Sequence, residues 1–401
     1  MIWTTWIMAL REIRRNTMRS ILTTLGIVIG VASVIAMVTL GRGATAKITA
    51  DIASMGSNLL ILAPGADRRG PAAQTAPAFK LQDAKAIVRE ASAVASVAPS
   101  ATGTQLIVYG DKNWNTSITG TTNDYFEVRG FAFAHGGGFS DAEESTGAAV
   151  CVLGETVRHQ LFGLQDPIGA TIRVGNIPCA VVGTLKTKGH SSFGNDQDDF
   201  VAIPLATFQR RIAGNTDVGA IFITTVSDHE ARRATWQIQS LMRERRRIAP
   251  GGADDFTVED MKEIAKTLGS VTGALTGLLG AIAGVSLLVG GIGIMNIMLV
   301  SVTERTREIG IRLAIGARGR EVLLQFLVEA VTLSALGGLV GAVLGLGASY
   351  AGAREVGLPF KIAPDVLLLA LGFSTTVGIA FGFFPARKAA GLHPIDALRH
   401  E

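Results

Sequence analysis

The chain has 401 residues, of which 48% are hydrophobic and 17% are charged, and 48 of them are glycines. Soluble proteins carry about 25% charged residues, so this composition argues against a purely soluble protein and favours membrane-spanning helices, which tolerate glycine. The net charge of +4 is too small to indicate a nucleic-acid partner. The length predicts two or more structural units.

The first 20 residues predict an amphipathic helix at the inner face of a membrane. Its apolar side chains recur close to helical spacing, with arginines between them; they are Trp3, Trp6, Ile7, Leu10 and Ile13. The alternative is a plain cytoplasmic extension of the helix that follows.

An apolar run at residues 21–40 is long enough to cross a bilayer, which takes about 20 residues. We interpret it as an uncleaved anchor, because no small-residue cleavage site follows it. No proline interrupts residues 21–53, so one helix there could reach roughly 50 Å, well beyond a hydrocarbon core of about 30 Å. Residues 21–55 are therefore predicted to form transmembrane helix 1 and an external stalk.

Residues 56–260 predict an α+β domain inserted between the first two membrane helices. We expect helices at residues 82–90 and 230–246, and strands at residues 58–63, 106–108, 149–153, 170–174, 179–182, 200–203 and 220–226. Residues 64–77 are rich in Gly, Pro and Ala, and residues 189–199 are polar, so both segments are predicted loops.

The chain carries no catalytic pattern. His190 lies near Asp196, Asp198 and Asp199 but has no second His or Cys at ligand spacing, which favours a solvated loop over a metal site. Cys151 and Cys179 lie in apolar runs, which predicts buried strand residues; a disulfide is the alternative in an external domain. There is no G-x-x-x-x-G-K-[ST] phosphate loop. We therefore expect no enzyme activity and no cofactor in this chain; any ATP and magnesium would be bound by another chain.

Three more apolar runs follow, at residues 275–302, 322–350 and 366–384. Helical periodicity extends back from the first of them to Thr257, which could form a capping box with Asp260, so a second stalk is predicted. The expected order is stalk and transmembrane helix 2 (261–302), a cytoplasmic coupling helix (303–321), transmembrane helix 3 (322–350), a short external loop (351–365), transmembrane helix 4 (366–385) and a cytoplasmic tail (386–401).

Positive charges set the orientation. Arginines cluster before the first run, between the second and third, and after the fourth, whereas the turn between the third and fourth has only Arg354 and Lys361. Short loops rich in Lys and Arg stay cytoplasmic. The termini and residues 303–321 are therefore predicted to be cytoplasmic and residues 56–260 external.

Glycines recur four residues apart in three of the runs. Such rows let helices approach closely in lipid, either within the chain or between two copies of it. The expected packing residues are Gly26, Gly30, Gly273, Gly277, Gly337, Gly341 and Gly345.

Residues 301–318, SVTERTREIGIRLAIGAR, are the most specific segment. A membrane helix ends there in dense charge, an apolar face follows at Ile311, Leu313, Ala314 and Ile315, and Gly316 suits a helix C-cap. The pattern predicts a short amphipathic helix that fits a groove on a soluble partner. The alternative, a plain positive loop, would not need an apolar face.

This segment resembles the coupling region of MacB-type and related FtsX- and LolC-type ABC permeases, which share S-V-x-E-R-x-x-E-I-G-x-x-x-A-x-G-A. The segments GSNLLILAPG, DYFEVRGF, LFGLQDPIGATIRV and FPARKAAGLHPIDALRHE also resemble the family, so the likeness covers essentially the whole chain. MacB itself carries its ATPase ahead of the first span, whereas this permease begins at Met1, so we expect a separate ATPase subunit.

The resemblance implies a set of ATPase-coupling residues which, except for Arg305, should face the ATPase: Glu304, Arg305, Arg307, Glu308, Ile309, Gly310, Arg312, Ala314 and Gly316. It also implies a homodimer of four-span subunits in the bacterial inner membrane. Its periplasmic domain would combine a porter-like part, about residues 56–124 and 213–260, with an insert at about 125–212. ATP-driven closure of the ATPases would move the coupling helices and reshape the outer domains, driving a periplasmic substrate into an adaptor and a TolC-like outer-membrane channel. The same machinery also serves lipoprotein release and FtsX-like activation of a cell-wall hydrolase. A membrane sensor would need a cytoplasmic signalling domain, and the predicted tails are short.

Overall fold

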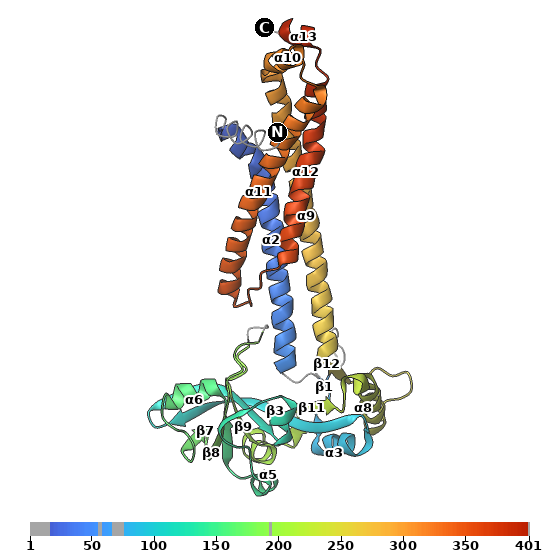
Figure 1. Ribbon diagram of the computed structural model, residues 1–401. Helices are drawn as coiled ribbons and strands as arrows, with labels where there is room; N and C mark the ends of the chain where they lie inside the picture. The colour runs from blue at the N-terminus through green and yellow to red at the C-terminus, as the bar shows by residue number, and fades with distance from the viewer. Residues whose placement is uncertain (1–16, 55–57, 66–75, 192–194, 400–401) are drawn as a thin grey trace. The chain divides into compact units, whose positions relative to one another are not determined.

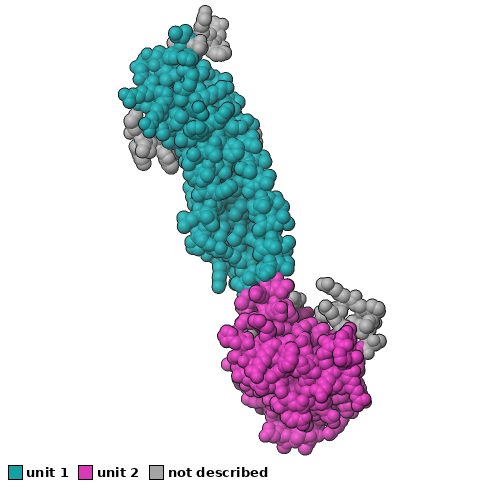
Figure 2. Space-filling model, turned by 90° about the vertical axis from the view of Figure 1, so that its right-hand side faces the viewer, with its two compact units in different colours: residues 1–47, 269–401 teal, residues 48–268 magenta. Residues whose placement is uncertain are grey.

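The computed structural model describes residues 17–54, 58–65, 76–191 and 195–399. The chain forms two compact units, residues 1–47 with 269–401 and residues 48–268, which Figure 2 shows in different colours. The amphipathic helix predicted over residues 1–20 lies almost wholly outside the described residues, as does most of the loop predicted over residues 64–77.

The first unit is built on four long helices (Figure 1): α2 (Thr17–Ser54), α9 (Met261–Glu304), α11 (Gly319–Val356) and α12 (Pro364–Ala390). Each is long and apolar enough to span a membrane, as predicted. The described residues of this unit also form two short helices, α10 (Thr306–Ala314) and α13 (Pro394–Arg399). With 44 residues α9 is roughly 66 Å long, about twice the hydrocarbon thickness of a bilayer.

Glycines allow these helices to touch backbone to backbone. A Cβ atom at Gly26 would lie 2.8 Å from the Cα of Gly290, so α2 and α9 meet there without side chains between them. A Cβ at Gly341 of α11 would lie 2.7 Å from the carbonyl oxygen of Val28 in α2. Glycine pairs of this kind replace the hydrophobic driving force that lipid does not supply.

Helices α11 and α12 are joined by a buried hydrogen bond as well as by packing. The Ser374 hydroxyl donates to the carbonyl oxygen of Ser334 at 2.6 Å. A Cβ at Gly378 would meet Ser334 and a Cβ at Gly338 would meet Ser374 at no more than 2.9 Å, so both helices are small at this crossing.

The second unit is an α+β domain around one large mixed sheet. In the described residues its strands follow the order β12-β1-β11-β3-β4-β9-β6-β8-β5, with β7 pairing both β3 and β8. The strands are β1 (Leu59–Pro64), β3 (Val94–Tyr109), β4 (Lys112–Thr121), β5 (Phe133–Gly136), β6 (Val150–Leu153), β7 (Thr171–Val174), β8 (Ile177–Leu185), β9 (Phe200–Pro204), β11 (Ala220–Thr225) and β12 (Phe256–Asp260). A separate small sheet pairs β2 (Phe79–Lys80) with β10 (Asp217–Val218).

Apolar residues on alternate faces of the sheet build two cores, because successive side chains of a strand point to opposite sides. In β1, for example, Leu60 and Leu62 belong to one core and Leu59 to the other. The first core is covered by α3 (Leu81–Glu90), α6 (Glu155–Phe162), α7 (Leu205–Phe208) and α8 (Ala231–Arg245).

The second core contains one end each of the long helices α2 and α9. Ile52 of α2 and Met261 of α9 are buried there with Tyr125 and Phe126 of α4 (Asp124–Val128). The boundary between the two compact units falls inside α2 and α9. Both helices are therefore fixed by packing at the domain end.

The structure corrects or extends the predicted secondary structure in two places. Residues 257–260 do not start a helix, because β12 pairs antiparallel with β1 over residues 256–260. Helix α9 begins at Met261 instead, and Asp260 Oδ1 accepts a hydrogen bond from the backbone N–H of Lys262 at 2.8 Å. The strand predicted at residues 106–108 is only the end of β3, a 16-residue strand whose hairpin partner β4 was not predicted.

Candidate coupling site

The predicted coupling segment forms a helix with a sharp end. Helix α10 follows α9 after Arg305, and Gly316 closes it with φ +105°, in the left-handed region. The N–H of Ala317 donates to the carbonyl oxygen of Arg312 at 3.0 Å, and the N–H of Gly316 to that of Leu313 at 3.2 Å. This bond pair is a Schellman motif, so the predicted C-cap at Gly316 is confirmed.

One side of α10 packs against the rest of its own unit. Ile309 is 3% exposed, and Gly310 is buried against α13, where a Cβ would lie 2.6 Å from the Cβ of Ala397. The prediction that Ile309 and Gly310 face a partner is therefore wrong. Helix α13 covers Gly310, and Ile309 lies in the apolar core of the first unit.

Polar contacts fasten the same element to α11. Arg305 Nη1 lies 3.7 Å from Glu329 Oε2, and both side chains are largely buried. Arg312 Nη1 donates to Gln325 Oε1 at 2.8 Å, while Arg312 Nη2 donates to Glu308 Oε1 at 2.5 Å. Two arginines of the predicted set thus hold α10 in place, and Arg312 is only partly exposed.

The other side of α10 remains open to solvent. It mixes charge with apolar surface, since Ile311 is 46% exposed and Ile315 is 81% exposed. The exposed members of the predicted set are Glu304, Arg307, Glu308, Ala314 and Gly316. We name the surface formed by these five residues with Ile311 and Ile315 the coupling ridge.

Sequence reasoning missed the contacts of this site on α11 and α13. Glu329 was detectable, because it is the one acidic residue in the apolar run 322–350, and an ionisable residue inside a membrane helix is functional by default. Gln325 and Ala397 gave no signal, since each is ordinary for its helix.

The predicted loop at residues 189–199 lies in the second unit, residues 48–268, which we call the outer domain. Its acidic residues are held by hydrogen bonds. Asp198, which is buried, accepts from the Thr187 hydroxyl at 2.6 Å and from the backbone N–H groups of Lys188 and Gly189. Asp199 accepts from Trp114 and Thr116. The prediction of a merely solvated loop was wrong for these two acids. Within the described ranges no three His, Cys, Asp or Glu residues gather as metal ligands.

Burial shifts the pKa of several titratable groups of the outer domain, among them Lys188 and Cys151. Desolvation, together with the nearby Arg129 charge, lowers the pKa of Lys188 to about 8, and Asp198 opposes the shift. Cys151 and Cys179 are free thiols, both buried in neighbouring strands, which confirms the predicted strand positions. Burial raises the pKa of the Cys151 thiol well above its ordinary value.

Comparison with known proteins places both units. Residues 20–241 match the MacB-like periplasmic core domain, and residues 280–394 match the FtsX-like permease C-terminal region. The chain belongs to the MacB/FtsX family of ABC transporter permeases. Both matched regions are permease regions, and the coupling ridge lies in the FtsX-like one.

Relatives within this family are named macrolide export ATP-binding/permease proteins. The one from Syntrophobacter fumaroxidans is 40% identical over 98% of this chain and 63% of its own length. The one from Chlorobium luteolum is 43% identical over 98% of this chain and 59% of its own length. The chain thus spans about three fifths of the length of these relatives.

Among solved structures, the periplasmic region of MacB from Actinobacillus actinomycetemcomitans aligns with 55% of this chain and 97% of its own. The TM-score is 0.47 and the identity 22%.

Proposed function

We propose that this chain is the permease subunit of an ABC exporter, driven by an ATPase that docks on the coupling ridge. The observation that carries the proposal is the two-sided character of α10. One side is held by α11 and α13, and the other presents Ile311 and Ile315 between charges. An apolar ridge edged by charge fits a groove on a soluble partner.

Movement of the ridge would be transmitted because α10 cannot slide freely. Its arginine contacts connect it to α11, which touches the backbone of α2 at Gly341 and Gly345. Helix α9 runs unbroken from Glu304 to Met261, where it enters the second core of the outer domain. A rigid helix fixed at both ends passes on a displacement, and ATP binding by the partner would bias the two resulting states.

The orientation that we propose follows the distribution of arginines. The coupling ridge and both termini are cytoplasmic, residues 48–268 are periplasmic, and the bilayer is the bacterial inner membrane. Cargo then enters from the periplasm and leaves through an adaptor and a TolC-like channel. The named relatives support export as the task.

We also propose that a second copy packs along α9. Gly26, Gly30, Gly337, Gly341 and Gly345 each have a neighbour from another helix within 3.5 Å of an added Cβ. In the described part of the chain, nothing lies within 4 Å of a Cβ at the row Gly273, Gly277, Gly280 and Gly284. A row of glycines that its own chain leaves open suits a symmetric helix pair in lipid.

Affinity purification of the tagged chain from its membrane, followed by mass spectrometry, tests the proposal. Recovery of an ABC ATPase with a periplasmic adaptor is expected. Recovery of an ATPase with a cell-wall hydrolase would indicate wall remodelling instead of export. Recovery of an ATPase with a second permease would indicate lipoprotein release. Recovery of no ATPase would refute the assignment.

A further inference from the structure

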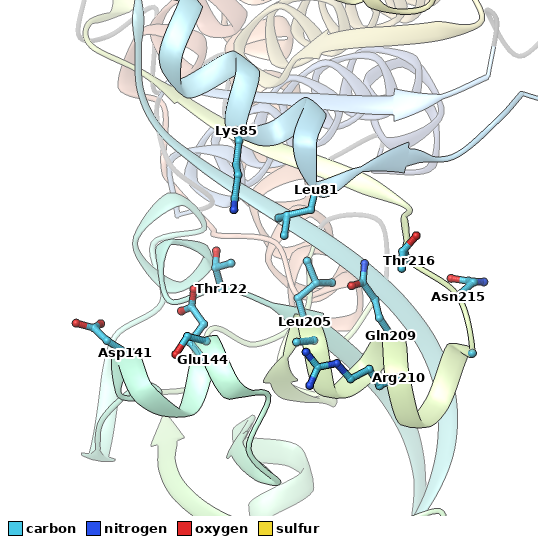
Figure 3. Close-up of a pocket in the computed structure, with 13 residues that line it drawn as sticks. Leu81, Lys85, Thr122, Asp141, Glu144, Leu205, Gln209, Arg210, Asn215 and Thr216 are labelled. Carbon is cyan, nitrogen blue, oxygen red and sulfur yellow. The ribbon is translucent and has the colours of Figure 1, made fainter.

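The outer domain contains a cleft of about 830 Å³ that has no role in the function proposed above. Helix α3 and residues 214–216 line one side (Figure 3), and the other side is formed by α5 (Asp141–Thr146), α7 and the π-helix η2 (Gln209–Ala213). The volume lies in the range of clefts that bind drug-sized molecules.

The cleft carries both signs of charge around an apolar centre. Lys85 of α3 and Arg210 of η2 are basic, whereas Asp141 and Glu144, one turn apart on α5, are acidic. Leu81 and Leu205 supply apolar surface.

Several of these polar groups have capacity left for a ligand. No hydrogen bond or ion pair joins Lys85 or Asp141 to another side chain in the described part of the chain. The Thr122 hydroxyl oxygen is buried without a hydrogen-bond partner, and Figure 3 shows Lys85 pointing from α3 toward Thr122. Among the described residues, the one hydrogen bond of the Arg210 side chain runs from Nη1 to the Thr146 carbonyl oxygen, at 3.1 Å.

We propose that this cleft binds a zwitterionic organic molecule with an apolar body, whose carboxylate pairs with Lys85 and Arg210 and whose ammonium pairs with Asp141 and Glu144. A ligand of a single charge would desolvate one pair of cleft charges without pairing it, which costs free energy. A zwitterion satisfies both pairs. That this molecule is exported cargo rests on the exporter function proposed above, whereas the binding itself does not.

Titration calorimetry on the full chain in detergent tests the binding, with trileucine as the probe. N-acetyl-trileucine lacks the ammonium, and trileucine amide lacks the carboxylate. The wild-type chain should bind trileucine saturably and each derivative about 10-fold more weakly, the usual effect of losing one charge-assisted hydrogen bond.

Variants assign the two ends. Asp141→Asn should lower the affinity for trileucine about 10-fold but leave that for N-acetyl-trileucine unchanged, because this derivative has no ammonium to lose a partner. Lys85→Ala should lower the affinity for the two peptides with a carboxylate and leave that for trileucine amide unchanged. Lys112→Ala, which removes an exposed lysine at the start of β4, is the matched control and should bind all three peptides like the wild type.

The proposal is overturned if trileucine does not bind at millimolar concentration, or if the variants weaken all three peptides alike. Neither result depends on the coupling ridge, so either one can be told apart from a failure of the proposed exporter function. Binding with the expected pattern but without stimulation of the partner ATPase would support the site and overturn only its link to export.

Discussion

Replacing Ile315 by alanine should weaken docking of the ATPase without weakening the fold. The change removes three carbon groups, each worth about 0.8 kcal/mol on burial. Since Ile315 is 81% exposed, nearly all of that burial is still available to a partner. The loss is therefore about 2 kcal/mol, or roughly 30-fold in the dissociation constant. The free energy of unfolding should change by less than about 0.5 kcal/mol, as for other surface substitutions.

Two controls separate docking from packing. Ile309→Ala, at a side chain that is 3% exposed, should destabilise the chain by about 2–5 kcal/mol. Leu164→Ala, at a fully exposed residue of the outer domain, should change neither quantity. Binding of the purified ATPase to detergent-solubilised chain would be measured by microscale thermophoresis, and unfolding by titration with SDS. A dissociation constant for Ile315→Ala within twofold of the wild type would refute the coupling ridge as the docking surface.

Three further results are expected. Gly341→Ala brings a Cβ to 2.7 Å from the carbonyl oxygen of Val28, so overpacking of about 1–3 kcal/mol exceeds the helix-propensity gain of about 1 kcal/mol. Gly347→Ala in the same helix meets open space and should be neutral or stabilising; equal SDS unfolding of the two variants would contradict the close contact. Glu329→Gln should cost about 1 kcal/mol in stability and lower export more than ATPase binding, and unchanged export would argue against transmission through α11. Lys188, with its pKa lowered from 10.5 to about 8, gains protons on unfolding between these pH values, so its contribution to stability rises with pH across that window. Urea unfolding of Lys188→Met should lack this rise, and identical pH profiles would show that the lysine is not desolvated.

Long, strongly patterned features were predictable from the sequence because one local property decides them. The four membrane helices follow from uninterrupted apolar length. The end of α10 follows from Gly316, since only glycine adopts a φ of +105° readily.

Features that depend on a distant partner were not predictable. Thr257 and Asp260 carry a helix-start pattern, yet pairing with β1 places them in a strand. Strand β4 was missed because its residues are mostly polar, although Thr116, Thr119 and Thr121 are buried.

The contacts of the coupling site also depend on distant segments and were not predictable from the sequence. Periodicity gives α10 an apolar side, but only its packing in the first unit determines which residues are covered. Ile309 enters the core and Gly310 meets α13, while Ile315 is left exposed. The glycine rows behave alike in sequence, and only the neighbouring helices separate the closed contacts of Gly341 from the open row on α9.

Because Cys151 and Cys179 are buried, the surface of this protein offers no thiol to reagents that react with cysteine. The sequence contains two cysteines, and both are buried, where a structural thiol is inert toward reagents in the solvent. Cysteines introduced at exposed positions can therefore be labelled selectively while both native cysteines stay in place. A spin label on the coupling ridge and another on the outer domain would report distances in the intact chain during ATP turnover, without first redesigning its core.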